Sequence, residues 1–315
     1  MNRIALTFVL AFAGVAAAQS FPTKALNFTV PWSPGGSADL TSRALASAMS
    51  KPLGENVTVI SRTGGGGAIG HLAISQARPT GYDIGMGTLE MVIPSWSKTS
   101  GLTIDNFTPI SLISINPAAI TVAKNSPFKT IGELVTFLKA NPGKLKASGT
   151  AKGGSWDMAR AGFLKTVGLK NAAMPWVPAQ GSAAAIQELL AGGVDVITVS
   201  VAEVNNLLKS GEVRTLAVMA DKRLSDHKTV PTLKESGINW SFGSFLSVVG
   251  PRRLSGDVVT KIDASIKAGM QEEEFKKFMT NAGFGMNYKN PAQFRVFLTQ
   301  QAAKMREVQD FIDSE

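Results

Sequence analysis

Apolar and polar positions in this chain follow each other in a way that predicts strands joined to helices by tight turns. Residues 26–30 form a short apolar run of strand character, and residues 40–49 carry apolar side chains at helical spacing. Between them lies PWSPGGSAD, in which two glycines permit a tight turn and Ser37 and Asp39 suit the first turn of a helix. The fold is therefore predicted to begin with a strand, a glycine-rich turn and a helix.

Three further turns rich in glycine and serine follow apolar runs in the same manner. The four turns lie at residues 31–39, 64–70, 149–155 and 178–182. In a doubly wound sheet, such turns gather at the carboxyl ends of the strands, where ligands bind. Their backbone N–H groups and the positive ends of the helix dipoles form candidate anion sites, although a sharp turn alone would explain any single one of them.

Chain length and two extended runs indicate the domain organisation. A chain of 315 residues with 44% hydrophobic and 17% charged residues is globular, and it exceeds what one core usually organises. Extended runs at residues 109–122 and 240–251 would carry the chain from one lobe to the other and back. We predict an α/β fold of two doubly wound lobes joined by hinge strands, with lobe 1 at residues 19–121 and 243–315 and lobe 2 at residues 122–242.

Residues 1–18 have the features of a cleaved signal peptide. Arg3 supplies a positive charge, an apolar run follows, and three alanines precede Gln19. The chain contains no cysteine, so neither a disulfide nor a lipid anchor on cysteine is expected. We predict that the protein is exported to the periplasm and remains there without an anchor.

The formal net charge of +9 indicates a mild attraction for anions. Lysine and arginine residues are dispersed along the chain, and the longest basic runs are pairs such as Arg252-Arg253 and Lys276-Lys277. Nucleic-acid binding is typical of clustered basic residues. We therefore predict no nucleic-acid partner.

The patterns for a nucleotide cofactor are weak. Gly65, Gly67 and Gly70 fit the dinucleotide fingerprint, and Glu90 follows about 20 residues later. That fingerprint belongs after the first strand of its unit, whereas here it follows the second. An exported dinucleotide-dependent enzyme remains an alternative, and we predict no cofactor.

Hydrolytic and metal chemistry have little support in the sequence. His71 and His227 are the only histidines, and they are interpreted as surface or supporting residues. The sequence contains no Gly-x-Ser-x-Gly elbow and no histidine or cysteine cluster with the spacing of metal ligands. We predict no catalytic residue and no metal site.

A succession of short motifs identifies a family resemblance. In order they are PGGSAD at residues 34–39 with Arg43, the glycine run at 64–70, TGY at 80–82, ANPGKL at 140–145, GGVDV at 192–196, LAVMA at 216–220 with Arg223, and VPTLKESG at 230–237. In this order they resemble the Bug proteins, which are the periplasmic solute receptors of tripartite tricarboxylate transporters. The resemblance covers essentially the whole chain after the signal peptide.

The resemblance implies a type II periplasmic-binding-protein fold whose lobes close on a small solute that bears a carboxylate. It implies that the glycine-rich turns hold the carboxylate largely through backbone groups and ordered water. The implied partners are a small organic acid and two integral membrane transporter subunits, and the receptor is expected to be a monomer. A ligand-sensing partner of a membrane histidine kinase would share this site, so that alternative stays open.

The predicted ligand-binding residues come from the four turns and the positions next to them. They are Trp32, Pro34, Gly35, Gly36, Ser37, Asp39, Gly65, Gly66, Gly67, Ser148, Thr150, Ser155, Trp156, Gly181, Ser182 and Ser200. The two tryptophans lie beside glycine-rich turns, where they would either contact an apolar part of the solute or pack helices onto strands.

The chain departs from the family pattern in two places. Val199 stands where many members carry an acidic residue, and Ala179-Gln180 replaces a Tyr-Lys pair. A solute ammonium group would lose a counter-charge at the first position, and the second leaves more room. These departures favour bulkier acids over amino acids.

Overall fold

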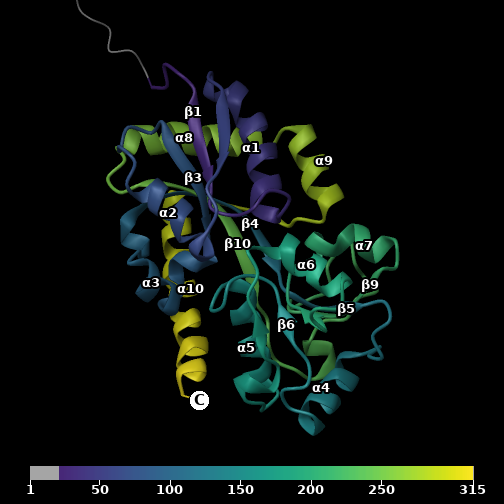
Figure 1. Cartoon of the computed structure of the whole chain (residues 1–315). Coiled ribbons are helices and arrows are strands. Elements are labelled where there is room, and N and C mark those ends of the chain that lie inside the picture. The colour runs from purple at the N-terminus through teal and green to yellow at the C-terminus, as the bar shows by residue number, and fades with distance from the viewer. Residues whose placement is uncertain (1–20, 315) are drawn as a thin grey trace, which may run out of the picture.

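The computed structural model describes residues 21–314, and the predicted signal peptide lies outside them. Figure 1 shows two lobes, one above the other, with β10 running between them. Within residues 21–314, no helix combines the length and the apolar character that a membrane span requires.

The first lobe is built on a six-stranded sheet with the order β2-β1-β3-β10-β4-β11. Its strands are β1 (Leu26–Val30), β2 (Val57–Ser61), β3 (Asp83–Thr88), β4 (Phe107–Pro117), β10 (Gly243–Pro251) and β11 (Met286–Lys289). Phe28 of β1 lies opposite Val59 on one side and Ile84 on the other, and both pairings are parallel. β10 pairs antiparallel with both β3 and β4.

Helices cover both faces of the first sheet. They are α1 (Ser37–Leu53), α2 (Ala68–Ser75), α3 (Pro94–Ser100), α8 (Gly256–Gly269), α9 (Glu273–Ala282) and α10 (Pro291–Asp313). Phe28 packs with Met49 of α1, Ile266 of α8 and Phe275 of α9 in one apolar core. Ile74 of α2 belongs to a different core on the opposite face. The sheet is therefore doubly wound, because each face is buried under its own helices.

The second lobe repeats this plan with five strands in the order β7-β6-β8-β5-β9. Its strands are β5 (Ala119–Ala123), β6 (Ala147–Ser148), β7 (Trp176–Val177), β8 (Val196–Ile197) and β9 (Val213–Val218), and its helices are α4 (Ile131–Ala140), α5 (Ser155–Thr166), α6 (Ser182–Leu190) and α7 (Asn205–Lys209). Short 3₁₀ helices complete the chain: η1 (Gly65–Gly67), η2 (Leu89–Val92), η3 (Ile104–Asn106), η4 (Asn171–Ala173), η5 (Ala202–Val204) and η6 (Lys234–Ser236). In each sheet three parallel strands adjoin an antiparallel strand that arrives from the other lobe. The predicted α/β fold of two doubly wound lobes is confirmed.

The chain changes sheets earlier than the predicted boundary after residue 121. β4 ends at Pro117, and Ala119 already pairs with Val218 in the second sheet. The apolar pattern runs unbroken through both strands, so the sequence could not show where one ladder ends and the next begins. On the return, the first sheet resumes with β10 at Gly243.

Helix α10 belongs to both lobes, although the sequence placed it in the first alone. Phe294 and Leu298 share an apolar core with Phe163 of α5. Near its middle, Lys304 donates a hydrogen bond from Nζ to the carbonyl of Ser241 at 2.6 Å, and burial against Trp240 and Phe242 lowers the pKa of its ammonium group. A change in the angle between the lobes must therefore be accommodated along α10 as well as at the two strand crossings.

A buried ion pair fixes the first turns of α5. Arg160 is 2% exposed, and Nη2 contacts Asp157 Oδ1 at 2.5 Å. Nη1 donates to the carbonyl oxygens of Asn171 and Met174 at 2.9 and 2.8 Å. Asp157 in turn accepts the N–H of Gly153 at 2.8 Å. The guanidinium therefore holds the glycine-rich turn before α5 in place.

We expect Arg160→Lys to lower the free energy of unfolding by about 2–4 kcal/mol, because one ammonium group cannot replace a buried fork of donors. Urea denaturation measures the change. Arg223→Lys is the matched control, since Arg223 pairs with Glu235 at the surface and should lose no more than about 0.5 kcal/mol. Equal losses in both variants would contradict the role of Arg160.

Candidate functional site

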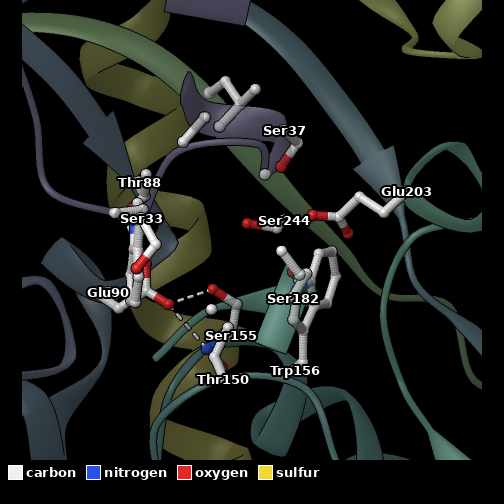
Figure 2. Close-up of a pocket in the computed structure, with 16 residues that line it drawn as sticks. Ser33, Ser37, Thr88, Glu90, Thr150, Ser155, Trp156, Ser182, Glu203 and Ser244 are labelled. Atoms are coloured by element: carbon white, nitrogen blue, oxygen red, sulfur yellow. Dashed lines mark hydrogen bonds between the residues drawn. The ribbon is translucent and has the colours of Figure 1, made fainter. Parts of the chain in front are cut away.

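A pocket lies between the lobes, where the turns after β1, β3, β6 and β7 meet (Figure 2). Its lining consists of Trp32, Ser33, Gly36, Ser37, Ala38, Thr88, Glu90, Thr150, Ser155, Trp156, Gly181, Ser182, Ala183, Glu203, Ser244 and Leu246. The cavity has a volume of about 40 Å³, which is room for a few water molecules. The space between these turns is therefore narrow as the lobes stand. A larger cavity of about 1100 Å³ lies beside it, lined by Gly65 and Gly66 of the first lobe and by Ala151 and Trp176 of the second.

Two helices from different lobes begin at this pocket. The caps of α1 and α6 are Gly36 and Gly181, neither of which carries a capping side chain. Gly181 has a φ of 143°, a conformation that requires glycine. The first N–H groups of both helices are thus left open, and both helix dipoles have their positive ends at the pocket. This arrangement suits an anion.

Hydroxyl groups add further donors to the pocket wall. The hydroxyl of Thr150 has no hydrogen-bond partner among the described residues, although the side chain is only 5% exposed. Ser182 Oγ accepts a hydrogen bond from Trp156 Nε1 at 2.9 Å, which fixes the indole in the wall. Ser33 Oγ donates across the lobes to the carbonyl of Gln180 at 3.3 Å. The buried hydroxyl of Thr150 would find a partner in a bound solute.

Glu90 is a buried carboxylate that links the lobes, and the sequence suggested it only as part of a dinucleotide fingerprint. Its Oε1 accepts the backbone N–H of Ser155 at 2.9 Å and also the hydroxyl of the same residue, as the dashed lines in Figure 2 show. Its Oε2 accepts the hydroxyl of Thr88 at 2.5 Å. Since Glu90 belongs to lobe 1 and Ser155 begins α5 in lobe 2, the protein's own carboxylate occupies that helix terminus. A solute carboxylate is therefore left with α1 and α6.

The glycine turn at residues 64–67 supports the pocket from outside. A Cβ on Gly67 would lie 3.1 Å from the indole of Trp32, so glycine is needed for this close packing. Nδ1 of His71 donates to the Gly67 carbonyl at 2.8 Å. His71 is fully buried, which lowers the pKa of its imidazole. Of the two interpretations offered for it, that of a surface residue is wrong, and that of a supporting residue agrees with its contact to Gly67.

The structure brings together the predicted residues Trp32, Gly36, Ser37, Thr150, Ser155, Trp156, Gly181 and Ser182. It places the others outside the pocket. Gly65 and Gly66 line a second cavity, and Ser148 Oγ donates to the carbonyl of Val177 at 2.7 Å. The remaining predicted residues beside α1 hold its first turn.

Three predicted residues, Pro34, Gly35 and Asp39, build the turn before α1 and its first turn. Pro34 and Gly35 form the turn, and Asp39 Oδ2 accepts the N–H of Gly35 at 3.1 Å. Asp39 also pairs with Arg43 at 2.9 Å. The acid thus stabilises the turn and does not face the solute space.

Two acidic residues line the pocket that the sequence did not assign to it. One is Glu90, and the other is Glu203, which lies in η5, the first helix after β8. Glu203 Oε2 accepts the N–H and the hydroxyl of Ser200 at 3.0 and 2.9 Å. Ser200 itself is buried and does not line the pocket. One signal in the sequence could have found Glu203. The family's acidic residue is missing at Val199, and Glu203 is an acidic residue four positions later in the same chain segment.

The remaining unpredicted lining residues are Ser33, Ala38, Thr88, Ala183, Ser244 and Leu246. No lysine, arginine or histidine of the described chain lines the pocket. Anion binding here must therefore depend on backbone and hydroxyl donors.

The last glycine of the dinucleotide-like run has a packing role. A Cβ on Gly70 would lie 2.5 Å from the backbone of Pro31, so this glycine serves the packing of α2 on the chain after β1. Within residues 21–314, no group of three or more histidine, aspartate or glutamate side chains could hold a metal ion.

Comparisons with known proteins agree with this architecture. The family model of the tripartite tricarboxylate transporter family receptor (TctC) matches residues 41–313. The protein BugT of Bordetella pertussis is 25% identical over 300 residues, which are 93% of this chain and 91% of that protein.

Solved structures share the fold over almost their whole length. The periplasmic binding protein BugD has a TM-score of 0.86 and 28% identity, covering 94% of this chain and 99% of that one. MatC from Rhodopseudomonas palustris with bound malate has a TM-score of 0.84 and 21% identity, covering 91% of this chain and 99% of that one.

We expect Glu90→Ala to enlarge the radius of gyration in solution scattering without added solute, because the hydrogen bonds from Ser155 to Glu90 across the lobes are lost. Glu188→Ala is the matched control, since Glu188 lies exposed on α6. An unchanged radius in the Glu90 variant would show that these bonds do not hold the lobes together.

Proposed function

This chain belongs to the tripartite tricarboxylate transporter family of receptors, and we propose that it binds a small organic carboxylate between its lobes and delivers it to two integral membrane transporter subunits. The observation that carries the proposal is the meeting of two uncapped helix N-termini, one from each lobe, at a single pocket. A carboxylate bound there would contact both lobes and so favour the closed arrangement.

The strength of such a site follows from its donors. Each helix N-terminus contributes about 0.3–1 kcal/mol to a nearby anion at an exposed site, and more in a partly buried one. The hydroxyls of Ser37 and Thr150 line the same space. Donors that the fold has already placed need no reorganisation when the solute arrives. The site therefore suits a carboxylate even though no basic side chain lines it.

The comparisons support the proposal at the level of the solute class. The MatC structure holds malate, a short acid, within the same fold. We propose a mono- or dicarboxylate for this chain.

The cellular setting of the proposal is the periplasm. We propose export through residues 1–18 as a cleaved signal peptide, with no lipid anchor, and a monomeric receptor. Relatives of this fold are solute-binding proteins, and we assign no catalytic residue. A ligand-sensing partner of a membrane histidine kinase would use the same pocket, and transport is preferred because the family is one of transporter receptors.

A comparison of an acid with its neutral amide tests the proposal. A thermal-shift screen of short mono- and dicarboxylates first identifies an acid that binds. In calorimetry we expect this acid to bind at least about tenfold tighter than its amide, or roughly 1.4 kcal/mol. Equal affinities would mean that the helix termini do not select the solute.

We expect Gly36→Val to abolish binding of that acid while the fold stays intact. Gly36 has an ordinary φ of −82°, and the nearest atom to an added Cβ is the Ser33 carbonyl oxygen at 3.8 Å. The backbone can accept valine, whose side chain would cover the start of α1. The matched control is Gly132→Val at the start of α4, where the nearest atom lies 3.9 Å away. Retained affinity in a folded Gly36 variant would contradict the assigned anion site.

A further inference from the structure

Glu203 presents one unoccupied carboxylate oxygen to the solute space. Its Oε2 accepts two hydrogen bonds from Ser200, whereas its Oε1 has no hydrogen-bond partner or ion pair among the described residues. In Figure 2 the carboxylate of Glu203 enters the pocket on the side away from Thr88 and Glu90. The anchoring by Ser200 leaves Oε1 as the oxygen that can meet a solute.

The position of Glu203 is set by the fold. The residue lies in η5, directly after β8, and its neighbours Val204 and Asn205 are buried. The two bonds from Ser200 restrain the side chain from both the backbone and the hydroxyl. Because its carboxylate is restrained, Glu203 would select a solute by the position of its donor group as well as by its charge.

The charges around the pocket determine what Oε1 of Glu203 can bind. The pocket has two carboxylates and no basic side chain in its lining. Both oxygens of Glu90 already accept hydrogen bonds from Thr88 and Ser155, so Glu90 needs no donor from a solute. When a solute displaces water from the pocket, an unpaired oxygen on Glu203 would become costly.

We infer that Glu203 selects solutes that carry a hydrogen-bond donor, an ammonium or a hydroxyl group, in addition to the carboxylate held by α1 and α6. The inference rests on the proposed function and specifies its solute class. The carboxylate and the donor belong to one molecule, because Glu203 lines the same pocket as the first residues of α1 and α6. A plain dicarboxylate would instead bring a second negative charge towards Glu203.

This arrangement revises the consequence drawn from Val199. The family's acidic position carries no acid there, but Glu203 supplies a carboxylate to the same pocket from four residues later. Amino acids and hydroxy acids are therefore favoured, whereas the sequence favoured bulkier acids that need no amino group.

The test uses acids that differ only in the donor. Calorimetry with the full mature chain compares succinate, malate and aspartate, and in a second series propionate, lactate and alanine, with both enantiomers of each chiral acid. We expect at least one donor-bearing acid to bind about tenfold or more tighter than the donor-free acid of its series. Malate and aspartate together distinguish a hydroxyl donor from an ammonium donor.

Glu203→Gln should reverse the preference within the series. The glutamine carbonyl can accept the hydrogen bonds of Ser200, which turns the amide NH₂ towards the solute and converts an acceptor into a donor. Donor-bearing acids should then lose about tenfold or more, while the donor-free acid should gain affinity. A gain cannot arise from misfolding. Glu188→Gln on the exposed face of α6 removes the same charge and should leave the preference unchanged.

The outcomes separate the two hypotheses. If donor-free acids bind wild type as tightly as donor-bearing ones, the inference fails and the proposed function stands. If a folded Glu203→Gln variant loses all acids alike, Glu203 is structural and the inference also fails. If an acid of the thermal-shift screen binds but none of either series does, the inference fails and the proposed function stands. If no acid of the screen binds, or if the amides bind as well as the acids, the proposed function fails and the inference fails with it.

Discussion

The hydrogen bonds between Glu90 and the start of α5 set the arrangement on which the pocket depends. They join a carboxylate from the turn after β3 to a helix terminus of the other lobe, away from water. A charge-assisted bond to a helix N-terminus is among the stronger polar contacts in a protein interior. Because this terminus is occupied from within, α1 and α6 remain as the helix N-termini that are open at the pocket.

The approach of the lobes is limited by small residues as much as by this carboxylate. A Cβ on Gly66 would lie 3.1 Å from the Cβ of Ala151 across the lobes, and one on Gly153 would lie 3.0 Å from Ser95 Oγ. Two strand crossings and α10 carry the connection, and an apolar core runs through α10 into α5. The two lobes therefore meet as packed bodies, in a contact that glycine permits and Glu90 stabilises.

The electrostatics of the pocket result from opposed contributions. Helix termini and hydroxyls favour a negative group, whereas Glu203 favours a donor, and no basic side chain of the described chain lies in the lining. Selectivity in such a site depends on where each group sits and not on net charge. The formal charge of +9 for the whole chain therefore says little about the solute.

The sequence by itself determined the fold class, the family and three of the four turns that build the pocket, because apolar periodicity and glycine position are local properties of the chain. β1 was predicted at its observed bounds, and the turns at Gly36 and Gly181 meet as expected. Tertiary structure alone decided which turns face the solute. Glu90 fills one helix terminus, Gly67 packs under Trp32, and Glu203 reaches the pocket only through the turn after β8. Such contacts join residues far apart in the sequence, and a pattern within one segment carries no record of them.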